Sequence, residues 1–320
     1  MHSLTLSRRA ALKHLSAGML AATVARSFAA EGSSGRKMTI NLMPGMIGVR
    51  ANQRELIELA HAHGFESVEP LGGELARMSA DEIKELLETM RAKRVVFGAA
   101  GLPVDFRGEE SKFEEGLSEL PKIADALKRA EVTRMGTWIM PGHNSLTHLQ
   151  NLKQHGTRLR QIAEILGERN IRLGLEYVGT KTLRDRFRYE FVHTMAETKE
   201  LITEIGAKNV GFVLDSWHWW NANETDKDIL TLKAEQIVAC DLNDAPAGIP
   251  KEMQIDGQRE LPLATGVIPV ESFLNALQKL GYDGPVRAEP FNKALNDLEN
   301  EEACARTADA MQRAFALIKT

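Results

Sequence analysis

From residue 38 onward, short apolar runs alternate with longer stretches in which apolar residues recur every three or four positions. The short runs have the length and composition of buried strands, and the longer stretches have the periodicity of amphipathic helices. The apolar runs span residues 38–43, 65–70, 94–100, 132–140, 171–178, 210–215, 237–244 and 285–291. The helical stretches between them include residues 52–64, 79–93 and 269–281, and a long one closes the chain at 294–318.

Eight strand-and-helix units in succession predict an α/β fold, a single-domain (β/α)₈ TIM barrel over residues 38–320. A doubly wound sheet is the alternative, but no glycine-rich phosphate-binding turn follows the first apolar run. Gly64 and Gly281 stand where C-terminal helix caps are expected, and the "SADE" stretch predicts a helix start at Ser79. Residues 179–194 are long for a strand-to-helix connection and predict a loop over the barrel mouth.

The first thirty residues do not follow the alternating pattern. The basic stretch "SRRAALK" precedes a short alanine-rich apolar run and the small residues of "SFAA". This order predicts a signal peptide over residues 1–30, which is too weakly apolar for a stable membrane anchor. The Arg8-Arg9 pair resembles a twin-arginine signal, which implies the twin-arginine export machinery as a partner and a periplasmic or otherwise exported protein. A general secretory signal or an ordinary amphipathic helix is the alternative, and residues 31–37 then form a flexible lead-in.

The composition is that of a globular protein, with 43% hydrophobic and 26% charged residues among 320. The formal net charge of -4 argues against a nucleic-acid partner, which would require a basic face. The two cysteines, Cys240 and Cys304, are too few for a disulfide framework and are expected to be free and buried. A homo-oligomer is compatible with the sequence.

Four acidic residues stand at equivalent ends of the last four apolar runs: Glu176, Asp215, Asp241 and Glu289. Because side chains alternate along a strand, an inward orientation of all four places mostly apolar neighbours against the helices. Four converging carboxylates repel one another, and a divalent cation would relieve this repulsion. The alternative is that each acid caps a helix or pairs with a surface base. Four acids at equivalent positions on four consecutive strands favour a shared metal site over this alternative. Arg287 would also face inward and partly neutralise the acids from below, unless it points to a helix.

The stretches "LEYVG", "LDSWH", "DLND" and "GYDGPVRAEPF" resemble motifs of the xylose-isomerase-like barrel superfamily, which includes sugar isomerases and epimerases. The resemblance covers residues 38–318 and implies that the four strand-end carboxylates hold a divalent metal and that His218 contacts the substrate. Two departures from the family pattern occur. Asp241 replaces the usual histidine, and the all-oxygen set favours Mn²⁺ or Mg²⁺ over Zn²⁺. The "RELPLATG" stretch, residues 259–266, has an extra residue beside the expected site.

Other side chains are candidates for binding the substrate. Glu69 lies in "GFESVEP", which resembles a family segment whose acid often contacts the substrate. Trp138 lies in the fourth run and Lys181 follows the fifth, and Arg287 and His218 complete the substrate-binding set. Four further histidines have no diagnostic spacing and are expected to be structural or exposed: His143, His148, His155 and His193.

Together these features predict a metal-dependent isomerase or epimerase that acts on a ketose or keto-sugar through an enediolate. Glu176 and Glu289 would exchange protons with the carbon beside the carbonyl, and His218 would hydrogen-bond the developing oxyanion. A dehydratase or lyase acting on an inosose or 3-keto-glycoside through the same enediolate is the main alternative. Phosphodiesterase chemistry on DNA needs a histidine-rich cluster that is missing here, and a non-catalytic sugar-binding barrel would not exchange substrate protons.

Overall fold

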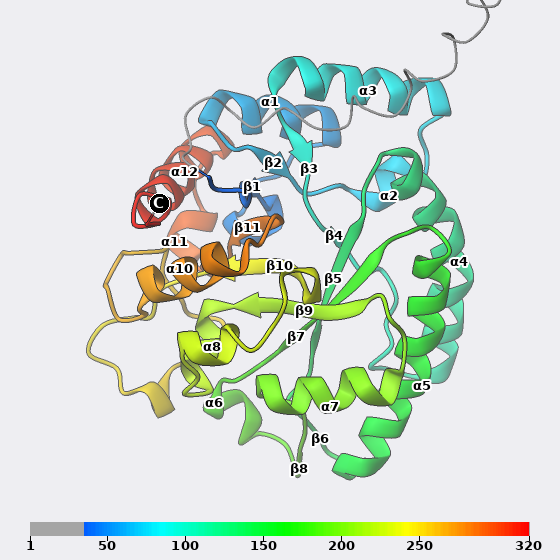
Figure 1. The fold of residues 1–320 in the computed structure, drawn as a ribbon, viewed down its shortest axis with the longest axis vertical. Helices are drawn as coiled ribbons and strands as arrows, with labels where there is room; N and C mark the ends of the chain where they lie inside the picture. The colour runs from blue at the N-terminus through cyan, green and yellow to red at the C-terminus, as the bar shows by residue number, and fades with distance from the viewer. Residues whose placement is uncertain (1–34, 320) are drawn as a thin grey trace, which may run out of the picture. The chain divides into compact units, whose positions relative to one another are not determined.

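The structure, a computed structural model, describes residues 35–319 and has a single parallel sheet at its centre (Figure 1). The strand order is β3-β2-β1-β11-β10-β9-β7-β5-β4, and every pairing is parallel. The two end strands are consecutive in the chain and are separated only by Gly98 and Ala99. They are therefore two halves of one interrupted strand, and the sheet curls on itself as an eight-unit TIM barrel. The fold class predicted from the sequence is confirmed.

The strands of the parallel sheet lie inside the predicted apolar runs, except that β4 extends one residue beyond its run. Their bounds are β1 (Thr39–Leu42), β2 (Ser67–Val68), β3 (Val96–Phe97), β4 (Ala100–Gly101), β5 (Arg134–Ile139), β7 (Arg172–Tyr177), β9 (Val210–Asp215), β10 (Ile237–Leu242) and β11 (Pro285–Ala288). The predicted mouth loop at 179–194 contains a short helix, α6 (Lys181–Arg184), and a strand, β8 (Tyr189–Glu190). This strand pairs antiparallel with β6 (Gly142–His143), so the loop is tied to the connection that follows β5.

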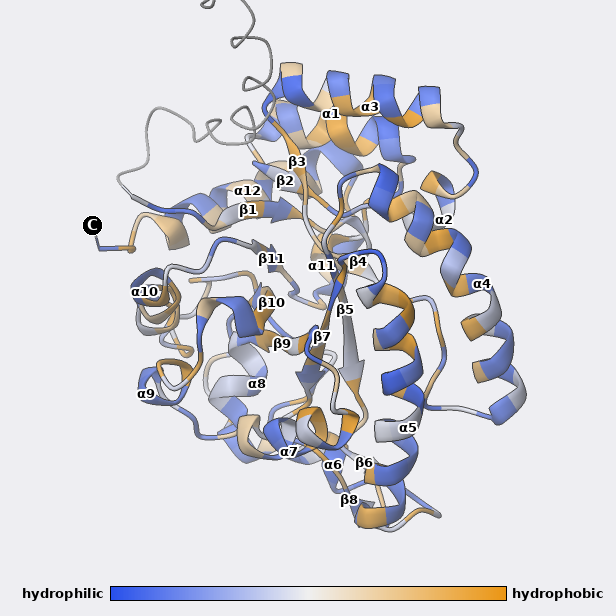
Figure 2. Cartoon of the chain, turned by 45° about the vertical axis from the view of Figure 1, so that its right-hand side comes forward, coloured by the Kyte–Doolittle hydropathy of each residue, from blue (hydrophilic) through white to orange (hydrophobic). Residues whose placement is uncertain are grey.

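The long helices surround the sheet, and Figure 2 shows that they carry both hydrophilic and hydrophobic residues, as helices packed on a core from one side do. They are α1 (Gln53–His63), α3 (Ala80–Lys93), α4 (Glu110–Arg129), α5 (His148–Gly167), α7 (Met195–Ile205), α10 (Val270–Leu280) and α12 (Asn300–Phe315). Shorter turns of helix are α2 (Gly72–Leu75), α8 (Ser216–Asn221), α9 (Asp226–Ile229), α11 (Lys293–Asn296), η1 (Pro44–Ile47), η2 (Ala234–Gln236) and η3 (Lys251–Met253).

Helix ends follow the sequence signals with one difference. Gly64 and Gly281 take left-handed conformations, with φ of 76° and 74°, and Ser79 caps α3 through the backbone N–H of Glu82. The closing helical stretch is not continuous, however, but is divided into α11 and α12. Leu298, between them, packs against the hydrophobic core, so the chain leaves the helical path there.

The barrel interior is filled by very small side chains. Ala99, Val213 and Ala239 form a buried cluster separate from the main core. A Cβ atom on Gly174 would lie 2.7 Å from Val213 Cγ2, so this position has no space for a side chain. The small residues leave room for a guanidinium in the same interior, and the structure places that of Arg287 there, bonded to Asp241 on the adjacent strand.

The described residues begin after the predicted signal peptide. Residues 1–30 and most of the predicted lead-in therefore lie outside the described part of the chain. At its start, Arg36 donates two hydrogen bonds of 2.8 Å to the carboxylate of Glu66. Cys240 and Cys304 are free and buried, as predicted. Among the described helices, none is both long and apolar enough to span a membrane.

Candidate active site

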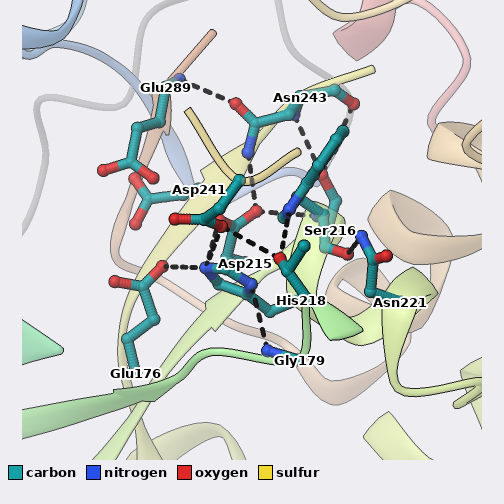
Figure 3. Close-up of polar contacts among 12 residues, drawn as sticks. Glu176, Gly179, Asp215, Ser216, His218, Asn221, Asp241, Asn243 and Glu289 are labelled. Carbon is teal, nitrogen blue, oxygen red and sulfur yellow. Dashed lines mark hydrogen bonds and ion pairs between the residues drawn. The ribbon is translucent and has the colours of Figure 1, made fainter. Parts of the chain in front are cut away.

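Four buried carboxylates meet where β7, β9, β10 and β11 end (Figure 3). Glu176, Asp215, Asp241 and Glu289 are each at most 8% exposed to solvent. Carboxylate oxygens of Glu176, Asp241 and Glu289 all lie within 4.8 Å of one another. A second group joins Glu176 and Asp215 to a nitrogen of His218 at the same spacing. The structure thus brings together all four strand-end acids that the sequence singled out.

Asn243 connects the ends of two of these strands. Its amide Nδ2 donates to Asp215 Oδ1 over 2.6 Å, and its Oδ1 accepts the backbone N–H of Glu289 over 3.2 Å. The same oxygen of Asp215 also accepts the backbone N–H of Trp217 over 2.8 Å, at the start of α8. Asp215 therefore has a fixed orientation. Asn243 belongs to the "DLND" motif, but its bridging role was not predicted.

Arg259 is the most important site residue that sequence reasoning missed. Its Nη1 donates to Asp215 Oδ2 over 2.8 Å and to Glu289 Oε2 over 2.7 Å, while Nη2 donates to Asp256 over 3.0 Å. The guanidinium also lies over the ring of Phe291 at 4.5 Å, and the side chain is only 2% exposed. In the sequence, Arg259 is the first residue of "RELPLATG", and no spacing there distinguishes it from a surface arginine.

Asp244 holds the segment that follows Arg259. Its two carboxylate oxygens accept backbone N–H groups from four consecutive residues at 2.7–3.1 Å: Thr265, Gly266, Val267 and Ile268. The backbone of Asp244 also pairs with that of Glu260 in an isolated antiparallel bridge. These bonds fix the path of the long connection between β10 and α10, and so the position of the guanidinium of Arg259.

Asp241 and Arg287 form a closed pair on adjacent strands. Arg287 Nε donates to Asp241 Oδ1 over 2.6 Å, and Nη2 donates to Oδ2, so the two planar groups meet through two parallel hydrogen bonds. Asp241 is fully buried and Arg287 is 5% exposed. The pair therefore has no net charge, although it stands among three further acids.

His218 is held so that its outer nitrogen faces the carboxylates. Its Nδ1 accepts the backbone N–H of Gly179 over 3.2 Å, which places the imidazole proton on Nε2. Burial lowers the pKa of His218, so the ring is neutral. Nε2 lies 3.7 Å from Glu176 Oε1, and Arg259 Nη2, also a donor, lies 3.2 Å away. The imidazole and the guanidinium therefore lie side by side at the edge of the carboxylate cluster.

The acids have unusual proton affinities. Burial, together with the charges of Glu289, Asp215 and Asp241, raises the pKa of Glu176 well above its ordinary value. Burial likewise raises the pKa of Glu289, against the opposing effect of Arg259. Glu176 Oε1 is buried and accepts no hydrogen bond from residues 35–319. An oxygen in that state lacks a partner that a cation or a proton would supply.

These residues fit a divalent cation. At the centre of the site, buried carboxylates outnumber the two buried guanidiniums of Arg259 and Arg287, and Asp256 shares Arg259 with Asp215 and Glu289. A divalent cation would offset this excess of acidic groups, and the buried Glu176 Oε1 is a ready ligand. The group formed by Glu176, Asp241 and Glu289 offers only oxygen atoms, the ligand type that suits Mg²⁺ and Mn²⁺, whereas the group with His218 also offers a nitrogen.

The remaining predicted residues lie at different distances from the cluster. Glu69 is half-buried beside Arg287 and Asp241, and burial raises its pKa to about 7. Trp138 pairs in register with Glu176 and is 40% exposed at the barrel mouth. Lys181 lies exposed on α6 and pairs with Asp185, so it does not join the acids.

In TIM-barrel enzymes, the active site lies where the carboxyl ends of the parallel strands meet. The buried acids of this protein lie at that end, an arrangement typical of TIM-barrel enzymes that use a metal ion. The chain belongs to the xylose isomerase-like TIM barrel family, whose sequence profile matches residues 57–314. The match confirms the family that the sequence motifs resemble. The chain is therefore an enzyme of this superfamily.

Individual relatives are more distant. An inosose isomerase from Halalkalibacterium halodurans is 21% identical over 259 residues, covering 79% of this chain and 88% of that protein. A 3-dehydroshikimate dehydratase from Pseudomonas aeruginosa is 26% identical over 134 residues, which cover 42% of this chain and 20% of that protein. A xylose isomerase domain protein from Alicyclobacillus acidocaldarius superposes with a TM-score of 0.76 at 30% identity, over 88% of this chain and 99% of that one. The IOLI protein, solved with a bound zinc atom, superposes with a TM-score of 0.73 at 20% identity, over 88% of this chain and 100% of that one.

Proposed function

We propose that this protein is an isomerase or epimerase that depends on a divalent metal, Mn²⁺ or Mg²⁺ by preference, and acts on a ketose, keto-sugar or inosose. The observation that carries the proposal is the buried, unpartnered Glu176 Oε1 beside three other carboxylates. The inosose isomerase relative, which matches most of both chains, supports the same class of substrate.

When bound, the cation would polarise a carbonyl oxygen and so acidify the neighbouring C–H bond. Glu176 is the base best prepared to accept that proton, because burial and neighbouring charges raise its pKa, and with one carboxylate oxygen on the cation the other would take the proton. Glu289, three strands further round the sheet, also has a raised pKa and can return a proton from a different direction. Return to the same carbon gives epimerisation, and return to the adjacent carbon gives isomerisation.

Two donors are placed for the oxygen of the resulting enediolate. His218 presents a neutral Nε2–H, and Arg259 presents Nη2 at 3.2 Å from it. Both side chains are buried, so their hydrogen bonds to a developing oxyanion act in a water-poor site and need little reorganisation. Arg259 Nη2 also donates a hydrogen bond to Asp256 over 3.0 Å, and this bond fixes the orientation of the guanidinium.

Loss of a hydroxyl or glycosyl group from the carbon beyond the enediolate would make the protein a dehydratase or lyase. The dehydratase relative is the observation that favours this second candidate. Both reactions share the first proton transfer, so the same residues serve either outcome.

The decisive experiment follows that transfer in D₂O. With Mn²⁺ present, ketoses, inososes and 3-keto-glycosides are screened by NMR, and a substrate should take up deuterium beside its carbonyl. Glu176→Gln and Glu289→Gln should each reduce turnover by roughly 10²–10⁴-fold, the usual cost of losing a general base. Glu260→Gln, which alters a carboxylate bound to Asn292 rather than the cluster, is the matched control and should keep full activity.

Metal occupancy is measured in each sample, so that loss of the base is separated from loss of the cation. Turnover without deuterium uptake, together with full activity in both glutamine variants, would refute the assignment of Glu176 and Glu289. Formation of an unsaturated or cleaved product would identify the lyase.

A further inference from the structure

A cavity of about 250 Å³ lies beside the barrel mouth, and none of the four clustered carboxylates lines it. It opens between the connection after β5, the start of α5 and the loop that precedes β8. The lining residues that matter to its chemistry are Arg107, Met140, His143, Asn151, His155 and Phe187.

Two buried hydrogen-bond acceptors at this cavity have no partner in the described part of the chain. Asn151 Oδ1 and His155 Nε2 are both unsatisfied, and the two residues are only 2% and 3% exposed. His155 Nδ1 lies 3.1 Å from the carbonyl oxygen of Asn151 and so carries the imidazole proton, which leaves Nε2 as a bare lone pair. Burial lowers the pKa of His155 to about 3, so this nitrogen stays an acceptor at neutral pH.

The histidine ring is fixed in this orientation. It lies edge-on to Phe106, with ring centroids 5.4 Å apart, and tilted against Phe191 at 4.9 Å. Two aromatic neighbours therefore hold an imidazole whose polar edge has nothing to bind within the described residues. Unpaired buried acceptors are costly, which is a reason to expect a ligand that donates hydrogen bonds to them.

Hydrogen-bond donors line the same cavity. His143 Nδ1 accepts the backbone N–H groups of Ser145 and Leu146, over 3.0 and 2.8 Å, so its proton is on Nε2. Arg107 is anchored by Thr137 and the carbonyl of Trp138 and remains cationic at neutral pH, because burial lowers its pKa only to about 10. The cavity thus combines acceptors and donors on rigid side chains.

The cavity also has an apolar wall. Phe187 packs directly on Gly142, where a Cβ atom would come within 2.4 Å of the Phe187 side chain. Met140 lines the same space. A flat apolar wall with polar groups around it is the usual arrangement for a sugar ring, whose C–H face packs while its hydroxyls bond.

The charge pattern narrows the ligand class. An anion would meet two unpaired acceptors, and a cation would meet Arg107, so a neutral ligand is favoured. Hydroxyl groups both donate and accept, which matches this mixture of partners. At ~30 Å³ for each water molecule, the volume is that of about eight waters, room for one small ring.

We propose that this cavity binds a neutral polyhydroxylated ring, and that this ring is the second ring of a two-ring substrate whose carbonyl-bearing ring lies at the acidic centre. The cavity lies near the acidic centre: Arg107 lines the cavity and lies 4.1 Å above the ring of Trp138, whose position on β5 is in register with that of Glu176 on β7. The two-ring part of the inference rests on the proposed function; the polyol site does not.

The polyol site is tested by binding without turnover. Methyl glucoside is titrated into the full-length protein by calorimetry. Asn151→Leu and His155→Phe each remove one acceptor, and each should weaken binding about tenfold, as loss of a buried hydrogen bond does. His148→Phe, at a residue that stacks on Phe191 but does not line the cavity, is the matched control and should bind as the wild type does. Glu176→Gln should also leave this affinity unchanged.

A second measurement does not depend on the variants folding. On titration with methyl glucoside, the side-chain ¹⁵N signal of His155 Nε2 in the wild type should shift as it gains a donor. The polyol site would be overturned if methyl glucoside did not bind or did not shift this signal. It would also be overturned if both cavity variants bound methyl glucoside as the wild type does, or if Glu176→Gln abolished binding.

The two-ring assignment is tested with substrates. Asn151→Leu and His155→Phe should lower kcat/KM about tenfold for a two-ring keto-sugar and leave a one-ring analogue unchanged. Equal effects on both substrates would overturn the two-ring assignment while leaving the proposed function intact. Binding of methyl glucoside with the predicted variant effects, but no turnover of any carbonyl sugar, would support the polyol site and count against the proposed function.

Discussion

The pair formed by Asp241 and Arg287 should behave as one unit in folding and in metal binding. Removing one member of a buried ion pair costs roughly 3–5 kcal/mol, because the other charge stays buried alone, whereas replacing both by groups of similar volume is nearly neutral. Asp241 is fully buried and Arg287 is 5% exposed, so solvent screens neither charge. We expect Asp241→His and Arg287→Met each to lose about 3–5 kcal/mol of unfolding free energy, and the double variant about 1 kcal/mol or less.

The measurement is urea-induced unfolding at pH 7 with a chelator present, which removes any contribution from bound metal. Arg313→Met is the control, because Arg313 pairs with Asp309 on an exposed helix face and should change stability by less than about 1 kcal/mol. A double variant as unstable as the sum of the two single variants would refute the reasoning, since it would mean that the two charges do not compensate each other.

The same three variants separate two effects on metal binding. Asp241→His alone leaves an uncompensated guanidinium beside the acids and should weaken binding of any divalent cation. The double variant restores neutrality and supplies an imidazole nitrogen, so it should shift preference from Mn²⁺ towards Zn²⁺. Competition between the two ions, followed by elemental analysis, measures the preference. An Asp241→His variant that gains zinc as strongly as the double variant would contradict the role given to Arg287.

Other expectations follow from the buried titratable groups and from the N-terminal segment. Burial lowers the pKa of His155 from 6.5 to about 3, so its contribution to stability is complete above pH 6.5 and declines as the pH falls towards 3. His155→Phe should therefore remove about 2 kcal/mol of the stability lost between pH 7 and pH 5, and an unchanged acid dependence would disprove this. Binding of Mn²⁺ should release protons from Glu176 and Glu289, whose pKa values are raised, and calorimetric heats that do not depend on the buffer's ionisation enthalpy would argue against it. Changing Arg8 and Arg9 to lysine should retain the protein in the cytoplasm if the twin-arginine proposal holds, and normal export of this variant would reject it.

The strand-end acids could be predicted because their positions follow from local rules. A parallel barrel places the ends of its strands together, and the alternation of side chains decides which residues face inward. The "VGFVLD" run ends at Asp215 as β9 does, and the alternation also places Arg287 in the interior with Asp241. No long-range information was needed for these assignments.

Arg259 could not be predicted by the same rules. It lies in the connection between β10 and α10, whose path depends on the bonds that Asp244 makes to residues 265–268. Those contacts are tertiary and leave no periodic pattern in the sequence. The division of the last helix at Leu298 and the unpaired acceptors of Asn151 and His155 have the same origin, since each depends on what another segment places against it.

The charge balance explains how this chain can replace the family's usual histidine at position 241. A neutral imidazole adds no charge to a metal site, and an aspartate alone would add one negative charge in a buried position. The Asp241–Arg287 pair is neutral as a unit, so it preserves the charge of the site while it changes the nearby donor atom from nitrogen to oxygen. Arg259 is shared by Asp215, Glu289 and Asp256, so the remaining acids outnumber the guanidinium and a divalent cation would offset the excess. We therefore propose that the aspartate shifts the metal preference of the site towards Mn²⁺ or Mg²⁺ and that the site still takes a divalent cation.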